Sequence, residues 1–158
     1  MSMQSAAAEI ANQQAELSAE ELAAWGGLLR THARLVRELD AELTAAHSLP
    51  LSSYEVLLRL AKAPEGQMRM SELADAVLLS RSGLTRLVDR LERERLVERR
   101  ACSDDARGQW AVITPAGRRL FREAQQTHLA GVRRRFVGRL TAEDMAELSR
   151  IWAHLQRA

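Results

Sequence analysis

Two short amphipathic segments joined by a tight connection constrain the fold more than any other part of this 158-residue chain. The first runs from Glu72 to about Val77, and Ser71 is placed to cap it. The second runs from Arg81 to about Glu94, and its apolar residues recur at helical spacing. They are Leu84, Leu87, Val88 and Leu91. Two short helices with so brief a turn between them predict a helix-turn-helix.

The helical period ends after this pair. Residues 96–100 and 109–113 form two short, strand-like runs. The residues between them, Ser103 to Gly108, are rich in Asp, Ser and Gly, which suit a hairpin loop. A β-hairpin that follows a helix-turn-helix is a wing, so the fold class is mainly α with a small β element: a winged helix-turn-helix.

Longer helices flank this unit on both sides. Capping boxes at Ser18–Glu21 and Ser52–Glu55 open helices, the first of which runs to about Ala46, and a turn is expected over residues 63–66. Thr114-Pro115 restarts the helix to about residue 137, and Thr141 caps a last helix to about Gln156. The expected organisation is a flexible segment at 1–16, dimerisation helices at 17–48 and 115–158, and the DNA-binding domain at 51–114. The first and last helices are apolar but have little core of their own against which to pack. Packing them against a second copy of the chain would bury them, which favours a two-fold homodimer.

Several classes of protein are excluded by the composition. No apolar run approaches the roughly 18 residues of a membrane span, and no secretory signal is visible. The single Cys102 excludes an internal disulfide and a multi-Cys zinc site, and the four His form no metal pattern. No phosphate-binding glycine loop or catalytic triad is present either. We therefore expect a cytoplasmic protein that is not an enzyme and needs no cofactor.

Charge is distributed unevenly along the chain. Residues 1–58 hold three Arg against eight acidic residues, whereas residues 81–100 hold seven Arg against four. Residues 118–139 hold seven Arg against one acidic residue. One surface is therefore expected to face a polyanion. The run at residues 133–135 points in three directions on a helix, which favours a solvated or inter-subunit role over a DNA contact.

The motifs in this region resemble those of a known family. Residues 80–92 (SRSGLTRLVDRLE) and 96–99 (LVER) are similar to the recognition helix and first wing strand of the MarR (multiple antibiotic resistance regulator) family. Residues 105–107 (DAR) and 113–117 (ITPAG) are similar to its wing motif and the restart of the next helix. Ala106 departs from the basic residue that relatives often carry. The resemblance spans residues 20–156 and implies a homodimeric transcription factor, usually a repressor of palindromic operators, with a small aromatic or phenolic effector.

The polar half of the second short helix is the predicted contact with double-stranded DNA. Arg81, Ser82, Thr85 and Arg86 lie in the first turns, where side chains reach base edges, and Arg90 is expected to meet a phosphate. A solvated polar face is the alternative interpretation.

Five further residues are expected to support DNA binding. Arg107 is predicted in the minor groove, Arg99 and Arg100 at phosphates, Ser71 as a phosphate anchor, and Asp105 as a wing support that pairs with an Arg.

The effector pocket is implied by the resemblance alone, which places it between the dimerising helices and the winged helix. Trp25, His32 and Tyr54 are candidates for lining it, and an ordinary core role is the alternative for each. Cys102 is either an oxidation sensor or an incidental wing residue. A winged helix that binds proteins and has lost DNA binding remains the alternative function.

Overall fold

The computed structural model describes residues 16–77, 79–101 and 108–157. It divides into two units, one through Arg37 and one from Glu38 onward. In the first unit, Ser18 and Glu21 form the predicted capping box at the start of helix α2 (Ala19–His47). The N–H of Ser18 donates to the Glu21 carboxylate at 2.7 Å, and the N–H of Glu21 donates to the Ser18 hydroxyl at 3.2 Å. The helix ends one residue beyond the expected Ala46.

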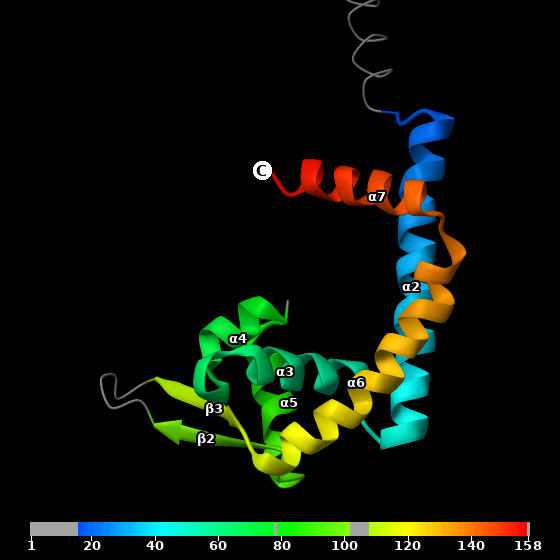
Figure 1. The fold of residues 1–158 in the computed structure, drawn as a ribbon. Helices are drawn as coiled ribbons and strands as arrows, with labels where there is room; N and C mark the ends of the chain where they lie inside the picture. The colour runs from blue at the N-terminus through cyan, green and yellow to red at the C-terminus, as the bar shows by residue number, and fades with distance from the viewer. Residues whose placement is uncertain (1–15, 78, 102–107, 158) are drawn as a thin grey trace, which may run out of the picture. The chain divides into compact units, whose positions relative to one another are not determined.

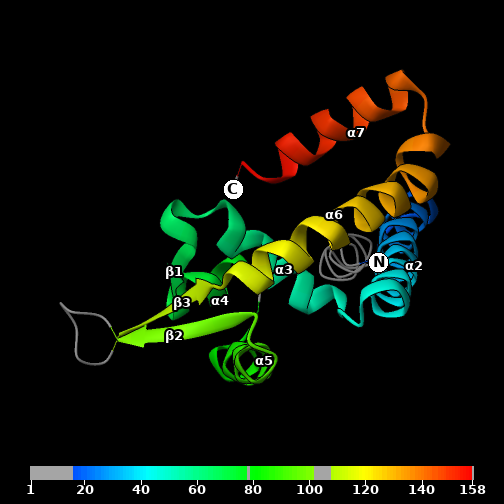
Figure 2. The ribbon, with the colours of Figure 1, turned by 60° about the horizontal axis from the view of Figure 1, so that its bottom comes forward.

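The second unit contains the winged helix. Helices α3 (Leu51–Lys62), α4 (Met70–Ala76) and α5 (Arg81–Arg93) gather beside the hairpin of strands β2 (Val97–Ala101) and β3 (Gln109–Ile113) (Figure 1). Helix α5 begins after Ser80, whose hydroxyl accepts the N–H of Gly83 at 3.1 Å. In Figure 2, α5 is seen nearly end-on beside β2. The predicted helix-turn-helix and wing are confirmed.

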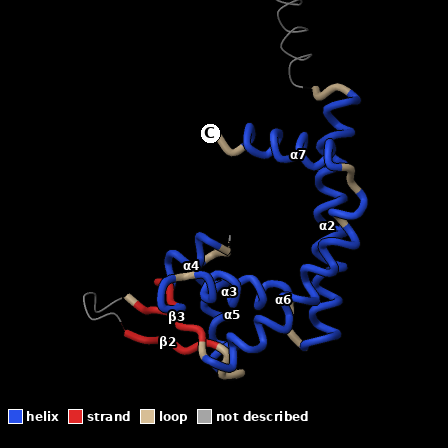
Figure 3. Tube along the Cα trace, in the orientation of Figure 1, coloured by secondary structure: helices blue, strands red, loops and turns tan. Residues whose placement is uncertain are grey.

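The sheet contains a third strand that the sequence pattern did not predict. Strand β1 (Gln67–Arg69) follows the 3-10 turn η1 (Pro64–Gly66) and pairs antiparallel with β3, so that the strand order is β1-β3-β2. Strand β1 is labelled in Figure 2, and β2 and β3 are the labelled red strands of Figure 3. Ala111 of β3 lies opposite Met68 of β1 and Arg99 of β2. A strand of three residues is too short to display the alternation by which strands are recognised.

Two predicted helix caps are wrong. Helix α3 begins at Leu51, before Ser52, because the N–H of Leu51 donates to the carboxylate of Asp40 at 2.8 Å. Helix α4 begins at Met70, so Ser71 lies inside its first turn rather than at its cap. Distant or flanking residues supply the contacts at both helix starts, and the local pattern did not reveal them.

The core is built where α2 ends and where α3, α4, α5 and β3 meet. Its fully buried residues come from each of these elements. They include Leu43, Val56, Leu57, Leu60, Leu73, Val88, Leu91 and Ala111. Because α5 contributes its whole apolar face to this core, the opposite face is fixed in orientation.

Two helices complete the second unit. Helix α6 (Pro115–Arg135) is capped by Thr114, whose hydroxyl accepts the N–H of Gly117 at 3.0 Å. After the 3-10 turn η2 (Val137–Arg139), helix α7 (Ala142–Leu155) is capped by Thr141. Both predicted caps are confirmed. None of the residues in α7 is buried. Among the helices that the structure describes, none combines the length and the apolar character that crossing a membrane requires.

Candidate nucleic-acid interface

Helix α5 presents four polar residues on one exposed face. Arg81, Ser82, Thr85 and Arg86 are all exposed, while Leu84 and Val88 on the other face are buried. The four residues predicted to read base edges therefore share one side of the helix. The structure brings them together as the sequence pattern indicated.

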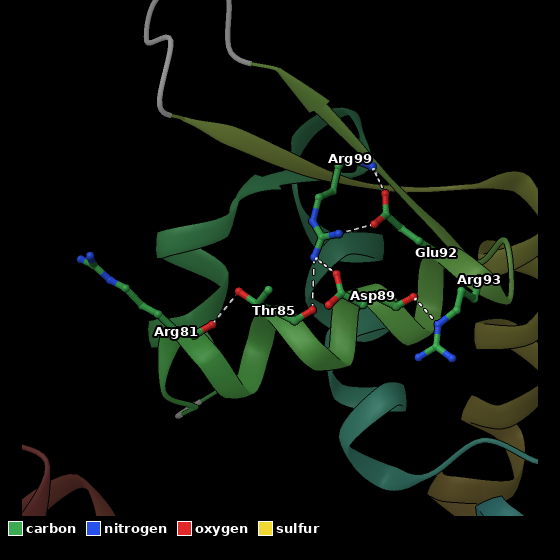
Figure 4. A network of polar contacts seen from close by, with 6 residues as sticks. All are labelled: Arg81, Thr85, Asp89, Glu92, Arg93 and Arg99. Atoms are coloured by element: carbon green, nitrogen blue, oxygen red, sulfur yellow. Dashed lines mark hydrogen bonds and ion pairs between the residues drawn. The ribbon is translucent and has the colours of Figure 1, made fainter.

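The two arginines of this face have no partner among the residues that the structure describes. Neither guanidinium forms a hydrogen bond or an ion pair with any residue in the described part of the chain, and the Arg81 side chain extends away from the helix (Figure 4). The Thr85 hydroxyl donates to the carbonyl of Arg81 at 2.9 Å, within the helix. The cationic groups are thus available to an external acceptor.

Ser71 lies beside this face. A depression of about 290 Å³ is lined by residues of α4, α5 and the base of the wing, among them Ser71, Arg81, Thr85 and Gln109. Ser71 is exposed there. Its predicted contact with a phosphate remains a prediction, although its predicted capping role was wrong.

Arg90 differs from the exposed arginines of α5. It is half-buried, and its guanidinium donates to the hydroxyl of Ser53 on α3 at 2.5 Å. This bond ties α5 to α3, a role that sequence reasoning did not anticipate. The phosphate contact predicted for Arg90 stays a prediction.

Arg99 and Arg100 occupy neighbouring positions on β2 but have different surroundings. The Arg100 side chain is exposed and pairs with Glu98 on its own strand. The Arg99 side chain turns to α5, where its guanidinium pairs with Asp89 at 2.7 Å and with Glu92 (Figure 4). The expectation that Arg99 binds a phosphate is therefore wrong, because its guanidinium is occupied by carboxylates of α5. The acidic pair three residues apart on α5 was the signal that sequence reasoning missed.

Three residues singled out in the wing, Cys102, Asp105 and Arg107, lie outside the described residues. The basic run at residues 133–135 lies within them. Arg134 pairs with Glu42 at 2.7 Å, and Arg135 pairs with Glu38 and Glu42, each at 2.8 Å. Burial alone would raise the pKa of Glu42, but the hydrogen bonds and charges of these arginines hold it below its ordinary value. Two of the three arginines thus have partners within the chain, in line with the preference against a DNA contact.

The residues proposed for an effector pocket lie in both units. Trp25 and His32 are exposed residues of the first unit. Tyr54 belongs to the second unit and is buried, with its ring centroid 5.7 Å from that of Phe121 and 4.6 Å from that of His128. Burial raises the pKa of the Tyr54 phenol and lowers that of the His128 imidazole. Tyr54 packs as a core residue, which was its alternative interpretation, and the pocket remains a prediction.

No metal chemistry is evident in the described part of the chain. Its His, Cys, Asp and Glu residues form no group of three or more that is arranged to hold an ion. The geometry instead offers cationic and hydroxyl groups on a helix fixed against a small sheet.

Comparison with known proteins places this geometry in a family. A model described as the MarR family matches residues 47–108. The homoprotocatechuate degradative operon repressor of Escherichia coli is 30% identical over 105 residues, which cover 66% of this chain and 69% of that protein. The crystal structure of AbsC, a MarR family transcriptional regulator from Streptomyces coelicolor, is 34% identical with a TM-score of 0.82, over 90% of this chain and 99% of that chain. Sco3205, a MarR family regulator from the same organism solved in complex with DNA, is also 34% identical, with a TM-score of 0.84 over 89% of this chain and 88% of that chain. The chain therefore belongs to the MarR family of transcriptional regulators.

Proposed function

We propose that this chain regulates transcription by placing α5 in the major groove of double-stranded DNA. The observation that carries the proposal is the exposed face of α5, which is formed by Arg81, Ser82, Thr85 and Arg86. The two guanidiniums of this face form no hydrogen bond or ion pair with any other described residue. Arg forms paired hydrogen bonds with guanine, and hydroxyls bond to several bases. The DNA complex of Sco3205, a relative at 34% identity, supports this proposal.

The contacts outside α5 follow from charge and exposure. Arg100 is exposed on β2 and is proposed to meet a phosphate. Arg107 is proposed to enter the minor groove with Asp105 as its support, which rests on the sequence because both residues lie outside the described part. Ser71 and Arg90 complete the proposed phosphate contacts.

The active form is proposed to be a homodimer. Large apolar side chains are exposed in both units, and a second copy would cover them. They include Leu22, Trp25, Leu28, Leu29 and Val36 in the first unit, and Leu129, Val137, Trp152 and Leu155 in the second. Two copies of α5 would then read the half-sites of a palindrome about one helical turn apart, roughly 34 Å.

We further propose that the protein is a repressor, and that a small aromatic or phenolic effector relieves repression by weakening its binding to DNA. Its support is the name of the Escherichia coli relative, which is a repressor of an operon for degrading homoprotocatechuate, itself a phenolic acid. A panel of phenolic acids that includes homoprotocatechuate tests this part. At least one member is expected to weaken operator binding, and unchanged affinity across the panel would remove the effector from the proposal.

Selection of bound genomic fragments tests DNA recognition itself. The wild-type protein is expected to enrich a palindromic site, with an affinity that falls steeply as salt increases. Arg86→Ala is expected to lose about 1–3 kcal/mol of discrimination at one base position. Arg122→Ala, which removes an exposed arginine of α6, is the matched control and should keep the preference. A wild-type protein that enriches no fragment would favour the winged helix as a protein-interaction module.

A further inference from the structure

One arginine connects the first wing strand to the recognition helix. The guanidinium of Arg99 on β2 pairs with Asp89 at 2.7 Å and with Glu92, and it donates to the carbonyl of Thr85 at 3.2 Å (Figure 4). The carboxylate of Glu92 also accepts the backbone N–H of Arg99 at 2.9 Å. Side chain and backbone of the same strand residue are therefore both held by α5.

The three acceptors lie along one face of α5. Thr85, Asp89 and Glu92 are spaced by four and then three residues, so that together they span two turns of the helix. The planar guanidinium, with its donors in a fixed fork, suits two carboxylates and a carbonyl at once. The Arg99 side chain is 19% exposed, and solvent ions screen such a pair less than a fully exposed one. The strand therefore cannot turn about α5 without breaking several bonds together.

This arrangement links the two parts of the proposed interface. Thr85 belongs to the exposed face of α5, and Arg100, next to Arg99, points to the opposite side of β2, since neighbouring strand residues alternate. The position of Arg99 therefore sets where the exposed side of β2 lies relative to Arg81 and Arg86. A shift of the strand would move the outward-facing side chains of the wing away from the duplex.

We propose that Arg99 is a positioning residue for DNA recognition, which fixes β2 to α5 so that wing and recognition helix meet the duplex at a set spacing. Arg99 does this without touching DNA. The inference rests on the proposed function.

The variant Arg99→Gln tests the proposal on a fragment selected by the wild-type protein. Binding is expected to weaken about tenfold, the size of coupling found within one bonded network. Guanine N7 protection from dimethyl sulfate reports on α5 in the major groove and is expected to persist. Hydroxyl-radical protection of the flanks reports on the wing and is expected to be lost. A wild-type footprint in Arg99→Gln would overturn the proposal.

Arg93→Gln is the matched control. Arg93 is exposed on the same helix, and among the described residues its Nε donates to the carbonyl of Asp89 alone, at 3.3 Å, within α5 (Figure 4). The substitution removes the same charge and is expected to leave both footprints intact. If Arg93→Gln also loses flank protection, the proposal is overturned, because the loss of a positive charge at any position on this side would then explain the effect without the contacts of Arg99.

The double variant Arg99→Gln with Asp89→Asn separates geometry from charge. It restores the local net charge but not the contacts, so flank protection is expected to stay lost. Its recovery would show that Arg99 acts through charge alone and would overturn the proposal. Arg99→Lys keeps the charge without the fork and is expected to recover only part of the protection.

Two further measurements keep the test decisive. Circular dichroism checks that each variant is folded. Should Arg99→Gln unfold, Asp89→Asn removes one acceptor alone and is expected to weaken flank protection, whereas an unchanged footprint would overturn the proposal. A wild-type protein that binds no fragment would instead defeat the proposed function, so the two failures are distinguishable.

Discussion

The guanidinium of Arg90 lies 2.5 Å from the hydroxyl oxygen of Ser53 and thereby joins the recognition helix α5 to α3. Ser53 is fully buried, and the Nε of Arg90 is buried without a hydrogen-bond partner in the described part of the chain. A hydrogen bond from a charged donor is about twice as strong as one between neutral groups. The bond therefore holds α5 against the core through a side chain that is only half-buried.

Replacing Ser53 is expected to destabilise the fold. Ser53→Ala leaves the half-buried guanidinium of Arg90 without its acceptor, and we expect the free energy of unfolding to fall by about 1–3 kcal/mol. Urea denaturation measures the change. Ser52→Ala, the same substitution at the exposed neighbour, should change the value by less than about 0.5 kcal/mol. Equal effects at the two serines would contradict a stabilising role for the bond.

Gly117 is expected to resist substitution for steric reasons. A Cβ at this position would collide with the carbonyl oxygen of Leu96, a backbone atom that also accepts the N–H of Thr114 at 3.0 Å. Because that carbonyl cannot move freely, Gly117→Ala is expected to destabilise by about 1–3 kcal/mol, despite the greater helix propensity of Ala. Thermal unfolding is the measurement, with Arg119→Ala on the same helix as control. A more stable Gly117→Ala protein would contradict this close packing.

The helices and the wing were predictable because their signals are local. The apolar spacing of Leu84, Leu87 and Leu91 lies within one helix, and the caps at Thr114 and Thr141 adjoin the helices that they begin. The same spacing identified the exposed face of α5, since a helix with one apolar side has its polar residues opposite.

Features that depend on contacts distant in sequence were not predictable in the same way. The strand β1 exists because β3, more than forty residues later, pairs with it. The bond of Arg90 to Ser53 spans 37 positions, so nothing near Arg90 distinguishes it from the exposed Arg86. Arg99 was misassigned because a basic residue beside a wing predicts a phosphate contact, whereas the carboxylates on α5 decide its role.

The stability of the protein is expected to depend on the protonation of His128. Its Nδ1 is buried without a partner in the described structure, and burial lowers the pKa of the imidazole below its ordinary value of 6.5. The unfolded chain then binds a proton more readily than the folded one. The contribution to stability is complete above pH 6.5 and is lost as the pH falls through 6.5 toward the lowered pKa.

Denaturation at about pH 7.5 and about pH 5.5 checks this dependence. The free energy of unfolding of the wild-type protein should be lower at the acidic pH, and His128→Leu should reduce the difference because it removes the titrating group. His154→Gln, at an exposed histidine of α7, should retain the wild-type difference. The same difference in His128→Leu as in the wild type would assign the pH dependence to other groups.

The exposed apolar face of α7 is expected to contribute to the proposed dimer. The Leu155 side chain is 63% exposed, and Trp152, three residues earlier on the same face, is 37% exposed. Leu155→Glu would place a charge where a second copy is proposed to bury apolar surface. Burial of a leucine contributes about 1.5–3 kcal/mol, so we expect the dimer dissociation constant to rise at least about tenfold. Light scattering over a concentration series measures it. His154→Glu adds the same charge at the neighbouring exposed residue, on the side of the helix opposite Trp152, and should leave the dimer intact. A Leu155→Glu protein that dimerises as tightly as the His154→Glu control would exclude this part of α7 from the interface.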